Sequence, residues 1–303
     1  MAKRILKISL LSLLAILVLA GAVVGGLMLY SVTYSIPEQA ASIRNETGLV
    51  QASGRTLYDA AGQPLQLIGV NAGQLLLQEG WMSPFALEPL KNEDGSYVKD
   101  GDGNIQYPEF SEEQFRTGIA SNPNLKDHSY DELLSVYLSC AFTEEDFRII
   151  KEDLGLNTVR LPFYYLNILN EDLSRKSEEE AFSFLDWFVE TAGKHGLYVI
   201  LDLHGAPGSQ NGYEHSGAAE RWADLWTSQE NLDATLALWR FVSRHYTQTR
   251  PDLGAWIAAY DLLNEPTYRY QSGTTRQCWD FFDLLYDTIR AGGDNHVITM
   301  EGC

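Results

Sequence analysis

The stretch Asn264-Glu265-Pro266 places an amide and a carboxyl group side by side after a short apolar run. The run, residues 256–263, has the length and composition of a buried parallel strand. Because proline has no backbone N–H to donate, we expect Pro266 to end the strand pairing. In parallel α/β barrels the carboxyl ends of the strands form the catalytic face. A carboxylic acid there could protonate the leaving oxygen of a glycosidic bond.

Other chemically capable side chains follow other predicted strands in the same way. They are Asn71 and Glu79 after strand 65–70, Arg160 in strand 157–161, which Pro162 should stop, and His204 after strand 197–203. Polar groups that converge from successive strand ends are typical of a barrel active site. Taken alone, a histidine or glutamate is more often structural, and Arg160 could be a surface residue of an edge strand.

A sugar bound among these residues would meet a different chemical group on each side. Glu265 would protonate the glycosidic oxygen and later deprotonate water. Asn264 would hydrogen-bond the sugar 2-OH, a contact that strengthens in the transition state. The charge of Arg160 would hold a carboxylate ionised. His204 and Glu79 would bind sugar hydroxyls.

The elements that must position these groups alternate between strand and helix. Amphipathic helices are predicted over 143–154, 178–195, 231–246 and 275–290, and a fifth strand over 296–300. A hairpin that turns at Asp59–Gly62 precedes the first strand of this series. The alternation predicts a parallel α/β fold, although a doubly wound sheet fits it as well as a barrel. No Gly-rich dinucleotide or phosphate loop follows the first strand, which disfavours nucleotide binding.

The composition excludes some classes of molecule as binding partners. The 303 residues carry 41 acidic and 22 basic side chains, a net charge of −19, which argues against nucleic acid and anionic membrane surfaces. Trp81 and Trp226 could stack on sugar faces, although core packing explains them equally well. Cys140, Cys278 and Cys303 are odd in number and lack metal-type spacing, so neither a disulfide framework nor a zinc site is indicated. Residues 91–127 are predicted to be a loop-rich insertion. Within it, Asp100–Asn104 resembles a calcium-binding loop only faintly, and the match fails at later positions, so a turn is the better interpretation.

The N-terminal segment predicts export of everything that follows it. Residues 1–7 are basic and residues 8–30 carry no charge, a stretch long enough to span a bilayer as one helix. Positive charge before the span predicts a cytoplasmic N-terminus. The alternative is a signal peptide cleaved near Ala22, which would release a secreted protein. The predicted organisation is therefore an anchor or signal segment at 1–30, a tether at 31–54 and a catalytic domain at 55–303.

Four blocks carry a resemblance to a known family. They are Gly69-Val-Asn71, Leu156-Asn-Thr-Val-Arg-Leu-Pro162, Ile200-Leu-Asp-Leu-His-Gly-Ala-Pro-Gly-Ser-Gln-Asn-Gly212 and Leu262-Leu-Asn-Glu-Pro266. The chain resembles glycoside hydrolase family 5, a retaining (β/α)8 TIM-barrel group. With Leu75-Leu-Leu-Gln-Glu-Gly-Trp81, the third block is most similar to the exo-β-1,3-glucanase branch.

The resemblance implies cofactor-free hydrolysis of a β-glucan or cellulose-like polysaccharide, without a metal. It implies Glu265 as the acid/base and Glu79 as a ligand of the terminal sugar. Arg160, His204 and Asn264 would line the −1 subsite, and Asn71 and Asn211 in the matching blocks are further predicted substrate-binding residues.

The chain departs from the family pattern at the nucleophile. In the family a second glutamate ends the seventh strand, whereas only five strands are predicted here. Glu301 ends the fifth, one βα unit after Glu265, so we do not assign it as the nucleophile. We expect a barrel truncated after about five βα units, and residues 1–303 alone to be inactive and poorly folded. The alternatives are a non-catalytic carbohydrate-binding remnant of the fold, or a complete chain in which Glu265 and Glu301 are the catalytic pair.

Overall fold

The computed structural model describes residues 41–82, 89–107, 110–218, 222–266 and 275–302. The chain divides into two compact units, residues 1–43 and 44–303, and every described helix and strand lies in the second. The predicted membrane segment 8–30, the possible cleavage site at Ala22 and residues 31–40 of the predicted tether lie outside the described residues. Within the described ranges, no helix is long and apolar enough to cross a membrane.

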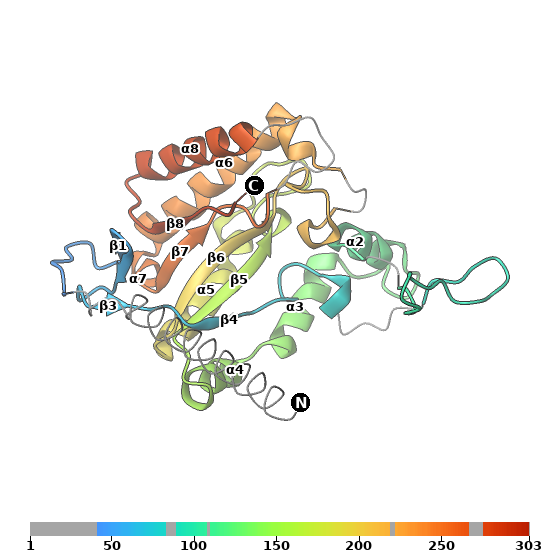
Figure 1. Cartoon of the computed structure of the whole chain (residues 1–303), viewed down its shortest axis with the longest axis horizontal. Helices are drawn as coiled ribbons and strands as arrows, with labels where there is room; N and C mark the ends of the chain where they lie inside the picture. Colours follow the sequence, from blue (N-terminus) through green and yellow to red (C-terminus); the bar gives the residue numbers. More distant parts are fainter. Residues whose placement is uncertain (1–40, 83–88, 108–109, 219–221, 267–274, 303) are drawn as a thin grey trace, which may run out of the picture. The chain divides into compact units, whose positions relative to one another are not determined.

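A parallel sheet is the framework of the second unit (Figure 1). Its strands lie side by side in chain order: β4 (Gly69–Asn71), β5 (Thr158–Tyr164), β6 (Tyr198–Gly205), β7 (Ile257–Asp261) and β8 (Val297–Thr299). A doubly wound sheet reverses its strand order partway, and this one does not. The order therefore resolves the ambiguity in favour of the singly wound arrangement found in part of a (β/α) barrel.

The predicted helices are confirmed between these strands. They are α4 (Glu144–Arg148) with the π-turn η2 (Ile149–Asp153), α5 (Glu178–Lys194), α6 (Gln229–Arg244) with η6 (His245–Thr249) and α7 (Pro251–Gly254), and α8 (Thr275–Ala291). The start of α5 shows a sequence signal that favours a helix there: Ser177 and Glu180 form a reciprocal capping box. After its end, Gly196 takes φ +66°, which ends the helix at little cost. Cys278 of α8 is disulfide-bonded, which its spacing did not indicate.

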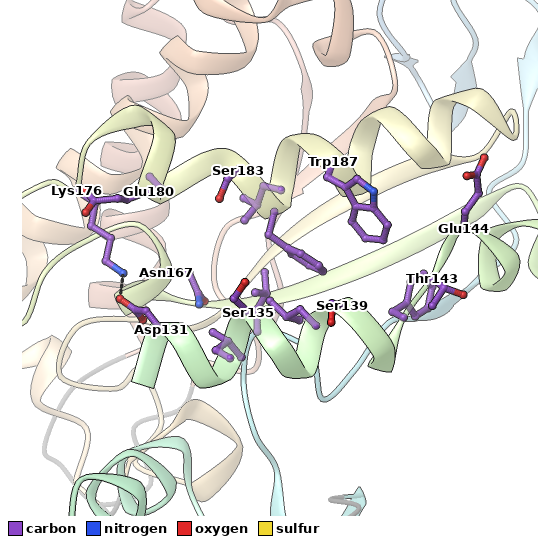
Figure 2. Close-up of a pocket in the computed structure, with 17 residues that line it drawn as sticks. Asp131, Ser135, Ser139, Thr143, Glu144, Asn167, Lys176, Glu180, Ser183 and Trp187 are labelled. Atoms are coloured by element: carbon purple, nitrogen blue, oxygen red, sulfur yellow. Dashed lines mark hydrogen bonds and ion pairs between the residues drawn. The ribbon is translucent and has the colours of Figure 1, made fainter. Parts of the chain in front are cut away.

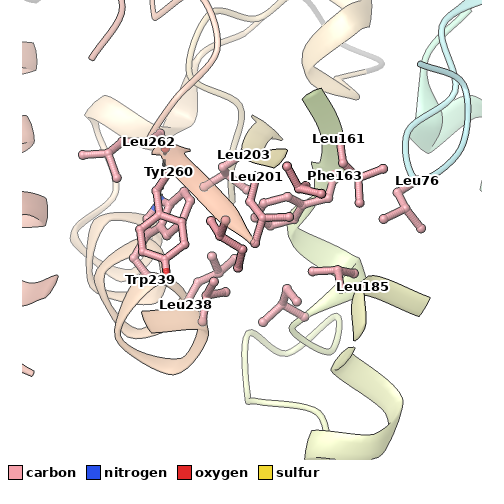
Figure 3. Close-up of a cluster of buried hydrophobic side chains, with 14 of the residues drawn as sticks. Leu76, Leu161, Phe163, Leu185, Leu201, Leu203, Leu238, Trp239, Tyr260 and Leu262 are labelled. Atoms are coloured by element: carbon pink, nitrogen blue, oxygen red, sulfur yellow. Dashed lines mark hydrogen bonds between the residues drawn. The ribbon is translucent and has the colours of Figure 1, made fainter. Parts of the chain in front are cut away.

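One apolar core joins sheet and helices (Figure 3). Phe163, Leu201 and Tyr260 supply the strand side, and Leu185 of α5 and Trp239 of α6 the helix side, all almost fully buried. The Trp239 indole also donates to the Leu262 carbonyl at 3.1 Å, which satisfies both polar groups inside the core. This packing fixes the directions in which β5, β6 and β7 present their carboxyl ends.

Two strand boundaries differ from the prediction. Pro162 lies inside β5 instead of stopping it; β4 last pairs with β5 at Asn71 and Arg160, so the missing N–H falls where that neighbour has ended. The predicted strand 65–70 is divided. Leu65 belongs to a separate antiparallel sheet of β1 (Gln51–Ser53), β2 (Thr56–Tyr58) and β3 (Pro64–Leu65), which contains the predicted hairpin turn.

The insertion after β4 is more structured than predicted. It holds η1 (Gly80–Met82), α2 (Glu112–Ser121) and α3 (Tyr130–Ala141); α2 falls within the predicted loop 91–127. Its signal, the capping box Ser111/Gln114, is present in the sequence. Asp100 accepts hydrogen bonds from the backbone N–H groups of Asp102 and Asn104, as expected of a tight turn. Short 3₁₀ turns complete the loops: η3 (Tyr165–Asn167), η4 (Glu214–Ser216) and η5 (Asp224–Trp226).

Candidate active site

The guanidinium group of Arg160 is the centre of the polar groups at the strand ends. Its Nη2 lies 3.1 Å from Asp202 on β6, 2.8 Å from Asp261 on β7 and 3.1 Å from Glu301 after β8. It also donates to Asn264 Oδ1 at 2.9 Å. One side chain of β5 therefore touches groups from the three strands that follow it. This confirms that Arg160 is part of an interior cluster and not a surface residue of an edge strand.

The cluster contains one positive charge and three carboxyl groups. Protonation of part of these carboxyl groups reduces the excess of negative charge. Burial raises the pKa of Asp202. Burial and the charge of Asp202 raise the pKa of Asp261 to about 7, against the opposing effect of Arg160. Asp202 Oδ1 and Asp261 Oδ1 are both buried without a hydrogen-bond partner among the described residues. An unpartnered buried oxygen favours the protonated, neutral carboxyl.

His204 links this cluster to the loop after β4. Its Nδ1 lies 2.5 Å from Asp202 Oδ2, and its Nε2 lies 3.6 Å from Glu79 Oε1. Burial alone would lower the pKa of His204, but the hydrogen bond and charge of Asp202, together with Glu79, raise it. Glu79 is buried and accepts from the Trp81 indole at 2.7 Å, while Trp81 as a residue is 76% exposed. The loop thus presents an exposed aromatic face beside a buried carboxylate.

Asn264 is held between β6 and β7. Its backbone N–H donates to the Leu203 carbonyl at 3.1 Å, and its own carbonyl accepts from Gln210 Nε2 at 2.8 Å. Gln210 also donates to the His204 carbonyl, so one buried amide joins the two strand ends. With Asn264 Oδ1 occupied by Arg160, the Nδ2 group is the part of the side chain left to donate to a ligand.

Glu265 differs from the acidic groups around it because its carboxyl is open to solvent. The side chain is 63% exposed, and its Oε2 lies 3.3 Å from His215 Nε2. The backbone is fixed: the N–H donates to Glu301 Oε2 at 2.8 Å, and the carbonyl accepts from Asn211 Nδ2 at 3.1 Å. These bonds hold a φ of +43°, which costs a non-glycine residue about 1–3 kcal/mol. The carboxyl is therefore accessible on a restrained backbone.

The structure brings together most of the predicted site residues. Glu265, Asn264, Arg160, His204 and Glu79 form one continuous chain of contacts. Asn71 ends β4 in register with Arg160 and is exposed. Asn211 is almost fully buried, and its amide contacts protein groups on both sides. Their substrate-binding roles stay predictions. Trp226 is a core residue whose indole donates to the Gln210 carbonyl.

Sequence reasoning missed several residues of the site: Asp202, Asp261, Gln210 and His215. Asp202 and Asp261 each interrupt an apolar strand, a pattern that could have identified them. Gln210 and His215 come from a loop after β6 and carried no such signal. In the described part of the chain, no group of three or more acidic, histidine or cysteine side chains could hold a metal ion.

Comparison with known proteins now decides the family. A family model described as cellulase (glycosyl hydrolase family 5) matches residues 119–303, more than half of the chain. The chain belongs to glycoside hydrolase family 5. Glycoside hydrolase family 5 is also the family that the four sequence blocks indicated.

The family relatives are longer than this chain. A glucan 1,3-beta-glucosidase of Lachancea kluyveri is 30% identical over 269 residues, which cover 88% of this chain and 56% of that protein. A beta-xylosidase of Phanerodontia chrysosporium is 37% identical over 166 residues, 55% of this chain and 33% of that protein. The solved rutinosidase from Aspergillus niger shares the fold: TM-score 0.54 at 15% identity, over 77% of this chain and 62% of that one. The chain thus spans about a third to just over half of these curated relatives.

A cavity of this family 5 chain lies away from the strand ends. It has a volume of about 690 Å³ and is formed between α3 and α5 (Figure 2). Lys176 and Asp131, 3.5 Å apart, lie at one end, and Trp187 and Glu144 toward the other. None of the predicted site residues lines it. We therefore take the strand ends, and not this cavity, as the candidate active site.

The raised pKa of Asp261 predicts a pH dependence of stability. Between about pH 4 and pH 7 the folded protein retains a proton on Asp261 that the unfolded chain releases. The free energy of unfolding should therefore fall as pH rises through this window. Asp261→Asn removes the titrating group. Its free energy of unfolding should therefore fall less between pH 4.5 and 7.5 than that of the wild type, by at least about 1 kcal/mol.

Urea unfolding followed by circular dichroism at the two pH values measures this difference. The matched control is Asp233→Asn on the exposed side of α6, which should follow the wild-type protein. Asp202 and His204 titrate in the same direction, so some pH dependence should survive in Asp261→Asn. Equal losses in the wild type and Asp261→Asn would contradict the prediction.

Proposed function

We propose that the protein containing this chain hydrolyses β-linked glucan by a retaining double displacement, with Glu265 as acid/base. The observation that carries the proposal is the contrast at the strand ends. Glu265 presents an exposed carboxyl from a restrained backbone, whereas the neighbouring acidic groups Asp202 and Asp261 are buried around Arg160. An accessible carboxyl among fixed polar groups is suited to proton transfer with a bound ligand.

Each neighbour has a role in this mechanism. Glu265 would donate its proton to the leaving oxygen as the glycosidic bond breaks, and would then take a proton from the water that hydrolyses the glycosyl-enzyme. Asn264 Nδ2, the free end of that amide, would donate to the sugar 2-OH. His204 and Glu79 would bind hydroxyls of the same sugar. Gln210 and Arg160 keep these groups in place and need not touch the substrate.

The hydrogen bonds of Glu301 favour a residue other than Glu301 as the nucleophile. Both of its oxygens have protein partners: Oε1 faces Arg160, and Oε2 accepts from the Glu265 N–H. A nucleophile needs an oxygen directed at the anomeric carbon. We therefore propose that a further strand of a complete (β/α)8 barrel supplies the nucleophilic carboxylate. The greater length of the curated relatives is compatible with this proposal.

The loop after β4 supports a neutral sugar as the ligand. Trp81 offers an exposed ring on which the apolar face of a pyranose could stack, and the adjacent Glu79 offers hydrogen-bond acceptors. A net charge of −19 would repel anionic polymers and leaves a neutral glucan unaffected. One relative is named a glucan 1,3-beta-glucosidase, which favours a β-1,3-linked glucan as the first substrate to assay.

The role of Glu265 is tested by Glu265→Gln in the full protein. The amide keeps the shape but carries no transferable acid proton, so kcat/KM on an unactivated β-1,3-glucan oligosaccharide should fall at least about 100-fold. The oligosaccharide's Kd should change little. Glu179→Gln on the exposed surface of α5 is the control.

Three outcomes of this assay have distinct meanings. Equal loss of binding and turnover would indicate misfolding. Binding without turnover in the wild type would favour a non-catalytic carbohydrate-binding protein, the alternative function. Wild-type turnover by Glu265→Gln would contradict the acid/base role.

The nucleophile can be located by trapping. A 2-deoxy-2-fluoro glucoside with a good leaving group should leave a covalent glycosyl group on the nucleophile, detectable in peptide mass spectra. We expect the label on a carboxylate other than Glu301, and Glu301→Gln should still be labelled. A label on Glu301 itself would instead make Glu265 and Glu301 the catalytic pair on adjacent strands.

We further propose that residues 8–30 export the domain, as an uncleaved anchor with the catalytic domain outside the cell. The proposal rests on their uncharged composition and on the basic residues before them. In cells, the protein should remain in the membrane fraction after alkaline carbonate extraction, and external protease should degrade its domain. Release into the medium with a new N-terminus near Ala22 would show a cleaved signal peptide instead.

A further inference from the structure

A histidine that the mechanism above does not use lies beside the exposed carboxyl of Glu265. His215 Nε2, in η4, lies 3.3 Å from Glu265 Oε2. A protonated imidazole at that distance would stabilise the ionised carboxylate. An acid that must hold a proton until the glycosidic bond breaks would then be impaired. The charge of His215 therefore matters to the proposed reaction.

Asn211 determines that charge because it occupies the same histidine nitrogen. Its Nδ2 lies 3.0 Å from His215 Nε2, and the two backbone partners of the amide fix its orientation. Asn211 Oδ1 accepts from the Tyr213 N–H at 2.9 Å, and Nδ2 donates to the Glu265 carbonyl at 3.1 Å. The second Nδ2 hydrogen then points to His215, so Nε2 must accept it and cannot carry a proton.

Among the described residues, the rings of Tyr213 and His204 also lie against His215. The Tyr213 ring stacks on the imidazole with centroids 5.3 Å apart. The His204 ring, centred 6.3 Å away, belongs to the cluster with Asp202 and Glu79 and has a raised pKa. A positive charge on His204 would oppose a second one on His215. Glu265 is the group whose own ionisation would favour a cation here.

We propose that Asn211 and His215 form a neutral pair that denies the Glu265 carboxyl a cationic partner, so that this carboxyl keeps the proton it gives to the leaving oxygen. The inference rests on the acid/base role proposed for Glu265. In the first step the proton passes from Glu265 to the leaving oxygen, and in the second Glu265 takes one back from water. Without a cation beside it, the carboxylate formed in between is the stronger base. Asn211 and His215 are positioning residues and need not touch the sugar.

A double-mutant cycle in the full protein tests the pair. Asn211→Asp removes the donor and places a negative charge beside Nε2, so His215 should become protonated. On an unactivated β-1,3-glucan oligosaccharide, kcat/KM at pH 7 should fall at least about 10-fold, and its decline at high pH should begin at lower pH. An aryl glucoside with a good leaving group, which needs little acid assistance, should lose less than about 3-fold in kcat/KM.

The second substitution separates charge from structure. His215→Gln keeps an acceptor for Asn211 and can never be cationic, so alone it should leave the pH profile near wild type. In Asn211→Asp/His215→Gln the cation is gone, and at least about half of the lost activity, on a logarithmic scale, should return. If Asn211 had a purely structural role, kcat/KM of the double variant would be no higher than that of Asn211→Asp. The control is His128→Gln, an exposed histidine between α2 and α3.

Two further readouts keep this test independent of the proposed function. In ¹⁵N-histidine spectra of the wild type, the His215 Nε2 signal should be that of an unprotonated nitrogen at pH 7, and that of a protonated one in Asn211→Asp. A protonated Nε2 in the wild type would overturn the neutral pair whatever the activity. Full activity of Glu265→Gln would refute the acid/base role. Loss of activity in Glu265→Gln without rescue in the double variant would refute the neutral pair alone.

Discussion

The interaction on which the site depends is the contact of Arg160 with three carboxyl groups from three successive strands. Coulomb attraction in a partly buried setting is strong enough to set the register of groups that are far apart in the sequence. Asp202, Asp261 and Glu301 each approach Nη2 within about 3 Å. Because one cation cannot neutralise all three, burial holds protons on part of the cluster. Arg160 therefore organises the site by fixing positions and sharing protons.

That cluster also fixes Glu265, whose carboxyl lies outside it. Glu301, held by Arg160, accepts from the Glu265 N–H, and Asn264, also held by Arg160, precedes Glu265 in the chain. Asn211 holds the Glu265 carbonyl from the other side. The energy that keeps Glu265 at a positive φ thus comes from neighbours that make no use of its carboxyl. The groups that hold the Glu265 backbone are therefore not the group that would react, and the carboxyl remains exposed for a ligand.

Sequence periodicity was sufficient for the framework and for the residues at the strand ends. The helices 178–195 and 275–290 and the strand 197–203 carried apolar signals, and the first helix also a capping box, that agree with their tertiary setting. Boundaries were less predictable, since Pro162 is tolerated inside β5 only because β4 ends early. The Asp202 and Asp261 contacts depend on which strands are neighbours, and sequence does not give strand order. His215 and Gln210 depend on the path of a loop, for which no periodic signal exists.

The placement of charge explains how two kinds of acidic group can coexist within one site. Asp202 and Asp261 lie where water is excluded, so their charge must be shared with Arg160 and His204 or removed by protonation. Glu265 lies where water enters, so its carboxyl is not removed from solvent as those of Asp202 and Asp261 are. A proton donor in that position needs some other means of retaining its proton, and a nearby cation would have the opposite effect. The buried amide of Asn211, directed at the His215 nitrogen beside Glu265, meets that requirement without adding charge.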